Sequence, residues 1–118
     1  MRNRAFALIG FLAAAGLAHA QDAVNADDVQ AGHKVAVAIC ANCHVAAPDQ
    51  AGEPIMRPPA PAFASIAQRK SLTAEHLRNY LATTHRGLDN LNGMPNPQLL
   101  DFQIRQVSAY LLSLRNAP

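Results

Sequence analysis

The sequence predicts a single all-α domain with three longer helices, at least one short helix and the loops that join them. Apolar residues recur at three- and four-residue intervals in several segments, which is the spacing of one helix face. No segment shows strong period-2 alternation flanked by hairpin turns, so we expect no sheet. The first 20 of the 118 residues read as an export signal, which leaves 98 residues for one small domain.

The first helix is expected from about residue 26 to residue 41. Asn25 is a suitable N-cap, and Asp27 and Asp28 place negative charge in the first turn, where it complements the helix dipole. Helical spacing puts four residues on one face: Val29, Gly32, Ala36 and Ile39. We therefore expect an amphipathic helix that packs inward through this face.

Two further helices are expected in the middle of the chain. The proline-rich segment 48–61 is predicted to be irregular, and a short helix follows around residues 63–68. Thr73 is the predicted N-cap of a third helix, with Glu75 in its first turn. Its predicted apolar side consists of Leu77, Tyr80 and Leu81. Gly87 is a stop signal that places the end of this helix near residues 85–87.

The last helix is expected from about residue 99 to residue 114, after a second irregular segment at residues 89–97. Its apolar stripe consists of Leu100, Ile104, Val107 and Leu111, with Tyr110 beside it. Such a stripe indicates a helix that buries one face along its length.

Residues 40–44 read Cys-Ala-Asn-Cys-His, which is the spacing of a covalent haem c attachment site. Thiols at Cys40 and Cys43 can form thioethers with two vinyl groups on one porphyrin edge, and an imidazole nitrogen of His44 can bind the iron. These are the only cysteines in the chain. A thioredoxin-type dithiol needs a preceding strand, a zinc site needs a second ligand pair, and a disulfide closing so tight a loop adds little stability. We therefore predict one haem c.

Met94 is the predicted second axial ligand of the iron. It lies in a loop, where Gly93 permits close backbone approach and Pro95 stiffens the chain. Met56 also lies in a loop, but only 12 positions after His44, which makes the opposite side of a haem harder to reach.

Three histidines are further alternatives for the same coordination position: His33, His76 and His85. His33 is expected to be a solvated side chain and His76 a surface residue. His85 is the strongest rival because it ends a helix close in sequence to Met94. A haem with two histidine ligands has a much lower reduction potential than one with histidine and methionine.

The N-terminus predicts export. Arg2 and Arg4 form a basic region, residues 5–17 are mostly apolar, and residues 18–20 read Ala-His-Ala, a small-x-small cleavage site. The apolar run is shorter than the roughly 20 residues that a spanning helix needs. We expect cleavage after Ala20, which divides the chain into a signal peptide at 1–20 and a single domain at 21–118.

Charge gives no indication of a nucleic-acid partner. Arg2 and Arg4 leave with the signal, so the ten Lys and Arg residues become eight, against eight Asp and Glu residues. The mature chain is therefore near neutral, and it carries no basic stripe with stacking aromatics. We expect no binding to nucleic acid.

The mature chain resembles the class I, mitochondrial-cytochrome-c-like monohaem cytochromes of bacteria, from about residue 27 to residue 114. The motifs are the Cys-Ala-Asn-Cys-His segment at 40–44, Gly-Met-Pro at 93–95 and Val-Ser-Ala-Tyr-Leu at 107–111. The resemblance implies the class I cytochrome c fold around one covalently bound haem.

The resemblance also assigns roles outside the motifs. It implies that the first and last helices cross at Gly32, against Tyr110 and Val107. It implies that the carbonyl of Pro61 accepts a hydrogen bond from His44, which orients the imidazole and raises its basicity.

The chain departs from the family pattern at Ala36, where many members have an aromatic residue, at Ala60, where glycine is common, and in having no tryptophan. Three arginines are candidates to neutralise a haem propionate instead: Arg57, Arg69 and Arg86.

Two axial ligands, His44 and Met94, leave no vacant position on the iron. The expected function is therefore a soluble, monomeric, periplasmic one-electron carrier between redox proteins, with no catalytic residues and no transmembrane segment in the mature chain. Two alternatives remain open. One is an electron-transfer subunit docked on a dehydrogenase or oxidase, and the other is a haem peroxidase or gas sensor in which Met94 is labile.

Overall fold

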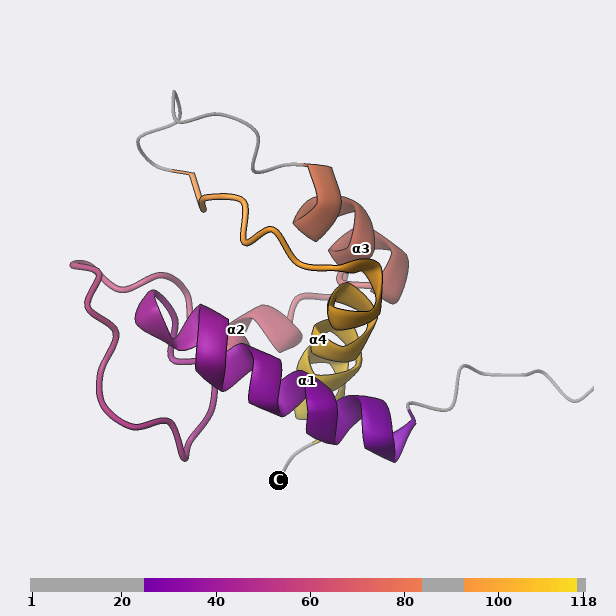
Figure 1. Ribbon diagram of the computed structural model, residues 1–118, viewed down its shortest axis with the longest axis horizontal. Helices are drawn as coiled ribbons and strands as arrows, with labels where there is room; N and C mark the ends of the chain where they lie inside the picture. Colours follow the sequence, from indigo (N-terminus) through magenta and orange to yellow (C-terminus); the bar gives the residue numbers. More distant parts are fainter. Residues whose placement is uncertain (1–24, 84–92, 117–118) are drawn as a thin grey trace, which may run out of the picture.

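The computed structural model describes residues 25–83 and 93–116, in which helices pack around a common core (Figure 1). The elements follow in the order α1 (Ala26–Ile39), η1 (Cys40–Asn42), α2 (Phe63–Ala67), α3 (Ala74–Thr83), α4 (Asp101–Ser113) and η2 (Leu114–Asn116), where η denotes a 3-10 turn. No strand occurs in the described residues, and a single parallel backbone pairing joins His44 and Ala60. The all-α prediction is confirmed.

Local signals set the beginnings of α1 and α3 as expected, whereas α4 begins at Asp101, two residues after the predicted start. The Oδ1 atom of Asn25 accepts a hydrogen bond from the Asp27 N–H at 3.0 Å, and Thr73 Oγ1 accepts one from the His76 N–H at 3.0 Å. The backbone N–H of Leu100 donates to Gln103 Oε1 at 2.9 Å at the start of α4. The predicted end of α3 near residues 85–87 lies outside the described residues.

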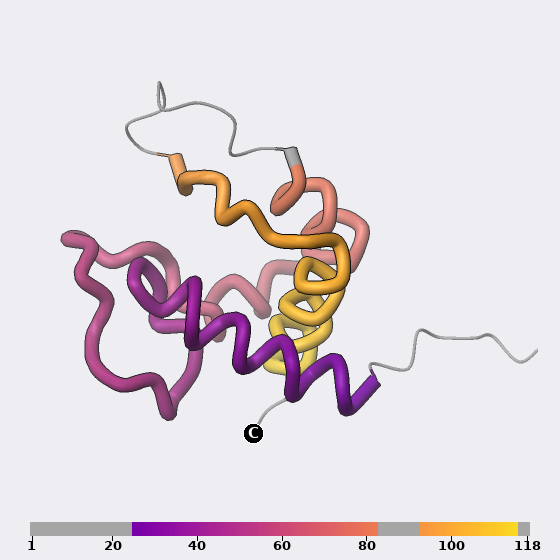
Figure 2. The backbone as a smooth tube through the Cα atoms, in the orientation of Figure 1, coloured from indigo at the N-terminus to yellow at the C-terminus, as the bar shows by residue number. Residues whose placement is uncertain are grey.

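The end of α1 differs from the prediction. The helix stops at Ile39 because the chain tightens there into η1, where the carbonyl of Cys40 accepts hydrogen bonds from the N–H groups of Cys43 at 3.1 Å and His44 at 2.9 Å. From this turn the loop 43–62, magenta in Figure 2, arches out and returns to α2. Ile39 is 39% exposed, so its assignment to the buried face of α1 is wrong.

Helices α1 and α4 cross at Gly32 (Figure 1). A Cβ atom on Gly32 would lie 1.9 Å from the carbonyl oxygen of Gln106 and 2.9 Å from Cβ of Tyr110. Only a residue without a side chain permits this approach. The crossing against Tyr110 is confirmed, but the backbone of Gln106 makes the closest approach, and Val107 faces a cavity described below.

His33 supplies an aromatic contact at the crossing, where Ala36 cannot. Its ring packs edge-on against Tyr110, with centroids 5.2 Å apart and planes at 80°. Its Nε2 atom lies 2.7 Å from Oδ1 of Asp49, and this hydrogen bond lowers the pKa of the Asp49 carboxyl. The expectation that His33 is simply solvated is therefore wrong, since it ties α1 to both α4 and the loop 43–62.

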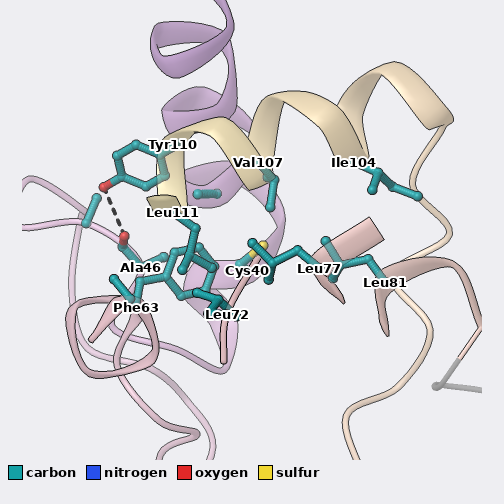
Figure 3. Close-up of a cluster of buried hydrophobic side chains, with 13 residues drawn as sticks. Cys40, Ala46, Phe63, Leu72, Leu77, Leu81, Ile104, Val107, Tyr110 and Leu111 are labelled. Atoms are coloured by element: carbon teal, nitrogen blue, oxygen red, sulfur yellow. Dashed lines mark hydrogen bonds between the residues drawn. The ribbon is translucent and has the colours of Figure 1, made fainter. Parts of the chain in front are cut away.

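The core lies where α4 meets the other elements (Figure 3). Its larger buried side chains are Phe63, Leu72, Leu77, Leu81, Ile104, Val107, Tyr110 and Leu111. Two predicted core residues are more exposed than expected. Leu100 is 59% exposed because it precedes the first turn of α4, and Tyr80 is 38% exposed at the edge of the apolar side of α3.

The Tyr110 hydroxyl anchors the loop that follows the cysteine motif. It donates a hydrogen bond to the carbonyl of Ala46 at 3.1 Å, in a buried environment (Figure 3). Replacing Tyr110 by Phe should lower the free energy of unfolding by about 1–2 kcal/mol, because the buried carbonyl loses its partner while the ring contacts remain. Denaturant unfolding of the haem-loaded protein measures this difference. An unchanged midpoint would show that the hydrogen bond adds nothing to stability.

Candidate functional site

A cavity of about 550 Å³ lies between the cysteine segment, α2, α3, α4 and the residues around Met94. Its volume falls in the range of roughly 300–1,000 Å³ typical of cofactor sites. The lining residues able to form covalent, metal or ionic bonds are Cys40, Cys43, His44, Met56, Arg57, Arg69, His76 and Met94. Much of the remaining wall is apolar, including Phe63, Ile66, Leu72, Leu77, Leu81, Val107 and Leu111. The cavity therefore suits a large apolar group with a few polar attachment points.

His44 is buried and held in one orientation. Its Nδ1 atom lies 2.7 Å from the carbonyl oxygen of Pro61, and since a carbonyl can only accept, Nδ1 donates. The other ring nitrogen, Nε2, is therefore the one available to a metal. The Phe63 ring packs edge-on against the imidazole, with centroids 5.4 Å apart and planes at 61°. The hydrogen bond to Pro61 that the family resemblance implied is present.

The two thiols have the wrong environment for dithiol exchange. Cys40 and Cys43 are not joined in a disulfide, and burial, together with the neighbouring Cys43, raises the pKa of the Cys40 thiol to about 11. A reactive thioredoxin-type cysteine instead has a lowered pKa at a helix N-terminus. Here the motif begins where α1 ends. Both thiols face the cavity, which suits a bond to its occupant.

Met94 shares the cavity with His44, although 50 positions of sequence separate them. It is half-buried, and its neighbours Gly93 and Pro95 also line the wall. The fold thus brings a thioether to the same space as the buried imidazole. Met56 also lines this cavity, so its short separation from His44 does not keep it away.

The histidine alternatives have different positions. His33 forms a hydrogen bond with Asp49 and does not line the cavity. His76 does line it, stacked on Tyr80 with ring centroids 6.5 Å apart and planes at 8°. The expectation that His76 is a surface residue is confirmed, since the residue is exposed, but its position at the cavity was not predicted. The four-residue spacing could have indicated its contact with Tyr80. His85 lies outside the described residues.

Two of the three arginines proposed to neutralise a haem propionate lie at the cavity. Arg57 and Arg69 line the cavity, and Arg86 lies outside the described residues. The guanidinium of Arg57 donates to the carbonyl oxygens of Pro54 and, at 3.0 Å, Met56. Among the described lining residues none is acidic, so an anionic substituent on the occupant meets positive charge there.

Sequence comparison identifies the family to which this site belongs. A family model described as cytochrome c matches residues 29–115, which is most of the chain. The chain belongs to the cytochrome c family. No match was found among curated proteins or among solved structures.

A cytochrome c domain carries covalently attached haem c with its iron, and the segment 40–44 is the matching attachment motif. The residues fit this group: two thiols and an oriented imidazole meet an apolar cavity of suitable volume. Proteins of this family typically transfer electrons and are often exported. Within residues 25–83 and 93–116, no helix is both long and apolar enough to cross a membrane.

Proposed function

We propose that this protein is a periplasmic one-electron carrier whose haem is attached through Cys40 and Cys43, with His44 and Met94 as axial ligands. The observation that supports this most directly is the shared cavity, which holds both thiols, the oriented imidazole and the thioether. When bound, the haem supplies a one-electron exchange between ferric and ferrous iron. If His44 and Met94 both hold the iron, no position would remain for a substrate, which favours carrier function over catalysis.

Each part of the site has a role in this proposal. The Pro61 carbonyl holds His44 in one tautomer and orientation. The apolar wall contributed by α3 and α4 would shield a bound haem from water. Pro95 stiffens the segment that presents Met94, and Gly93 permits a close backbone approach beside it. A rigid ligand set changes little between the two oxidation states, which favours fast electron transfer to and from redox partner proteins.

Export is the second part of the proposal. It rests on the basic, apolar and small-residue regions of residues 1–20. The mature protein is then a single domain at 21–118, monomeric and near neutral. Mass spectrometry of the purified protein should find one haem on a chain that begins at Gln21.

The axial ligand provides the sharpest test of carrier function. Replacing Met94 by His should keep a six-coordinate, low-spin haem while exchanging sulfur for nitrogen. Loss of the thioether removes a preference for ferrous iron, so the reduction potential should fall by about 0.2 V. For a one-electron couple this is about 4.6 kcal/mol. Spectroelectrochemical titration measures the potential, and the weak red-edge absorption of ferric iron bound to sulfur should vanish.

Three variants test the rival ligands: Met56→Leu, His76→Gln and His85→Gln. Each should leave the red-edge band and the potential nearly unchanged. Survival of the band in Met94→His, or its loss in Met56→Leu, would mean that Met94 is not the ligand. A wild-type protein that never shows the band would favour a haem with two histidine ligands or an open site, and carrier function would lose its main support.

A further inference from the structure

Arg115, in η2 at the end of the described chain, binds three backbone carbonyls at once. Its Nε atom donates to the carbonyl of Ala67 at 2.8 Å. Its Nη2 atom donates to the carbonyls of Arg69, at 3.0 Å, and Leu72. These acceptors belong to the last residue of α2 and to the turn that leads to α3. One guanidinium thus holds one end of a helix and the turn that follows.

Arg115 supplies hydrogen-bond donors at the C-terminal end of α2, where the helix itself has none for its last carbonyl groups. The last carbonyls of a helix have no partner within the helix, and a cation there also complements the helix dipole. A helix of only five residues is too short to be stable by itself, so α2 depends on contacts from elsewhere. The fork of donors on an arginine suits several carbonyls, whereas a lysine offers a single point charge.

The other end of α2 contacts the proposed iron ligand. Pro61, two residues before α2, accepts the hydrogen bond from His44 Nδ1, and Phe63, its first residue, packs on the imidazole ring. The N–H of Phe63 also donates to the carbonyl of Val45, beside His44, at 3.0 Å. A five-residue helix is only about 7.5 Å long. A change in position at its far end therefore reaches these contacts.

We propose that Arg115 is a positioning residue for His44. By fixing the C-terminal end of α2, it keeps the Pro61 carbonyl and the Phe63 ring against the imidazole. That hydrogen bond raises the basicity of the ligand, and a more basic imidazole stabilises ferric iron. Weakening it should therefore shift the equilibrium toward ferrous iron and raise the reduction potential. The inference rests on the proposed role of His44 as an axial ligand.

Two substitutions of Arg115 separate its geometry from its charge. Arg115→Lys keeps the charge but loses the fork, so any rise in potential comes from position alone. Arg115→Gln also removes a positive charge, which by itself would lower the potential. In Arg115→Lys we expect the reduction equilibrium to shift toward ferrous iron several-fold, up to about tenfold, or 59 mV for one electron. Exchange of the His44 Nδ1–H with solvent, followed by NMR of the reduced haem-loaded protein, should become at least about tenfold faster.

Arg105→Lys, which keeps the positive charge as Arg115→Lys does, is the matched control. This arginine lies on α4, pairs with Asp28 at the surface at 3.3 Å, and has no hydrogen bond to α2. It should leave the potential and the exchange rate unchanged. If Arg115→Lys lowers the melting temperature but moves neither quantity, Arg115 has only a structural role and the inference is wrong. If the wild-type spectrum lacks a histidine ligand, the proposed function fails first, and the two failures are distinguishable.

Discussion

Replacing both Cys40 and Cys43 by alanine is expected to give a chain that keeps no haem after acid–acetone extraction and is largely unfolded. The cavity of about 550 Å³ is walled by the side chains that form most of the core. Losing the occupant of such a cavity would cost about 13 kcal/mol at 24 cal/mol per Å³, an upper bound because water would enter the open side. That is comparable with the whole stability of a small domain, roughly 5–15 kcal/mol.

The single variants provide the control for this experiment. Cys40→Ala and Cys43→Ala should each retain haem through one thioether and stay folded. Extraction followed by absorbance spectroscopy measures covalent haem, and circular dichroism with thermal melting measures folding. A wild-type chain that folds without haem and melts in a sharp transition would contradict the account, because the cavity would then need no occupant.

Gly32→Ala should lower the free energy of unfolding by about 3 kcal/mol, near the upper end for overpacking. The added Cβ would lie 1.9 Å from the Gln106 carbonyl oxygen and 2.4 Å from its carbon. These are backbone atoms inside a helix, so they cannot rotate away, and α1 and α4 must separate. For a domain of this size the expected fall in melting temperature is roughly 12–24 °C.

The predicted loss of stability in Gly32→Ala is opposite in sign to the effect that helix propensity alone would give. In an ordinary helix interior, replacing glycine by alanine stabilises by about 1 kcal/mol. Ala38→Gly, at an exposed position of the same helix, measures that propensity directly and should cost about 1 kcal/mol or less. A Gly32→Ala variant as stable as the wild type would mean that the two helices do not approach so closely.

Helix positions were predictable because their causes are local. The N-cap at Asn25, the cap at Thr73 and the apolar spacing along α4 act over a few residues, and all three are in place. The errors at Ile39 and Leu100 have a common physical reason. A helical stripe extends along the whole helix, but a neighbouring element covers only the part near the contact, so the residues at helix ends stay exposed.

The candidate site also has one part that was predictable from local sequence and one part that depends on the tertiary structure. The motif at 40–44 was readable because two thiols and an imidazole act together within five residues. Met94 was a reasoned choice among several loop and helix residues. Its presence in the cavity, together with Met56 and His76, depends on how the loops and α3 are arranged. The contacts of Arg115 had no sequence signal, because carbonyl acceptors more than 40 positions away leave no pattern in side chains.

The sequence by itself determined the helices, the covalent attachment motif and the near-neutral charge of residues 21–118, since each depends on residue type and short-range spacing. Only the tertiary structure decided which distant residues share the cavity, which aromatic ring packs at the α1–α4 crossing and what holds α2 in place. Such contacts depend on how closely two helices can approach at Gly32 and on where the intervening loops return. The helix approach and the course of the loops both depend on the backbone conformation of many residues, so no short sequence pattern predicts them.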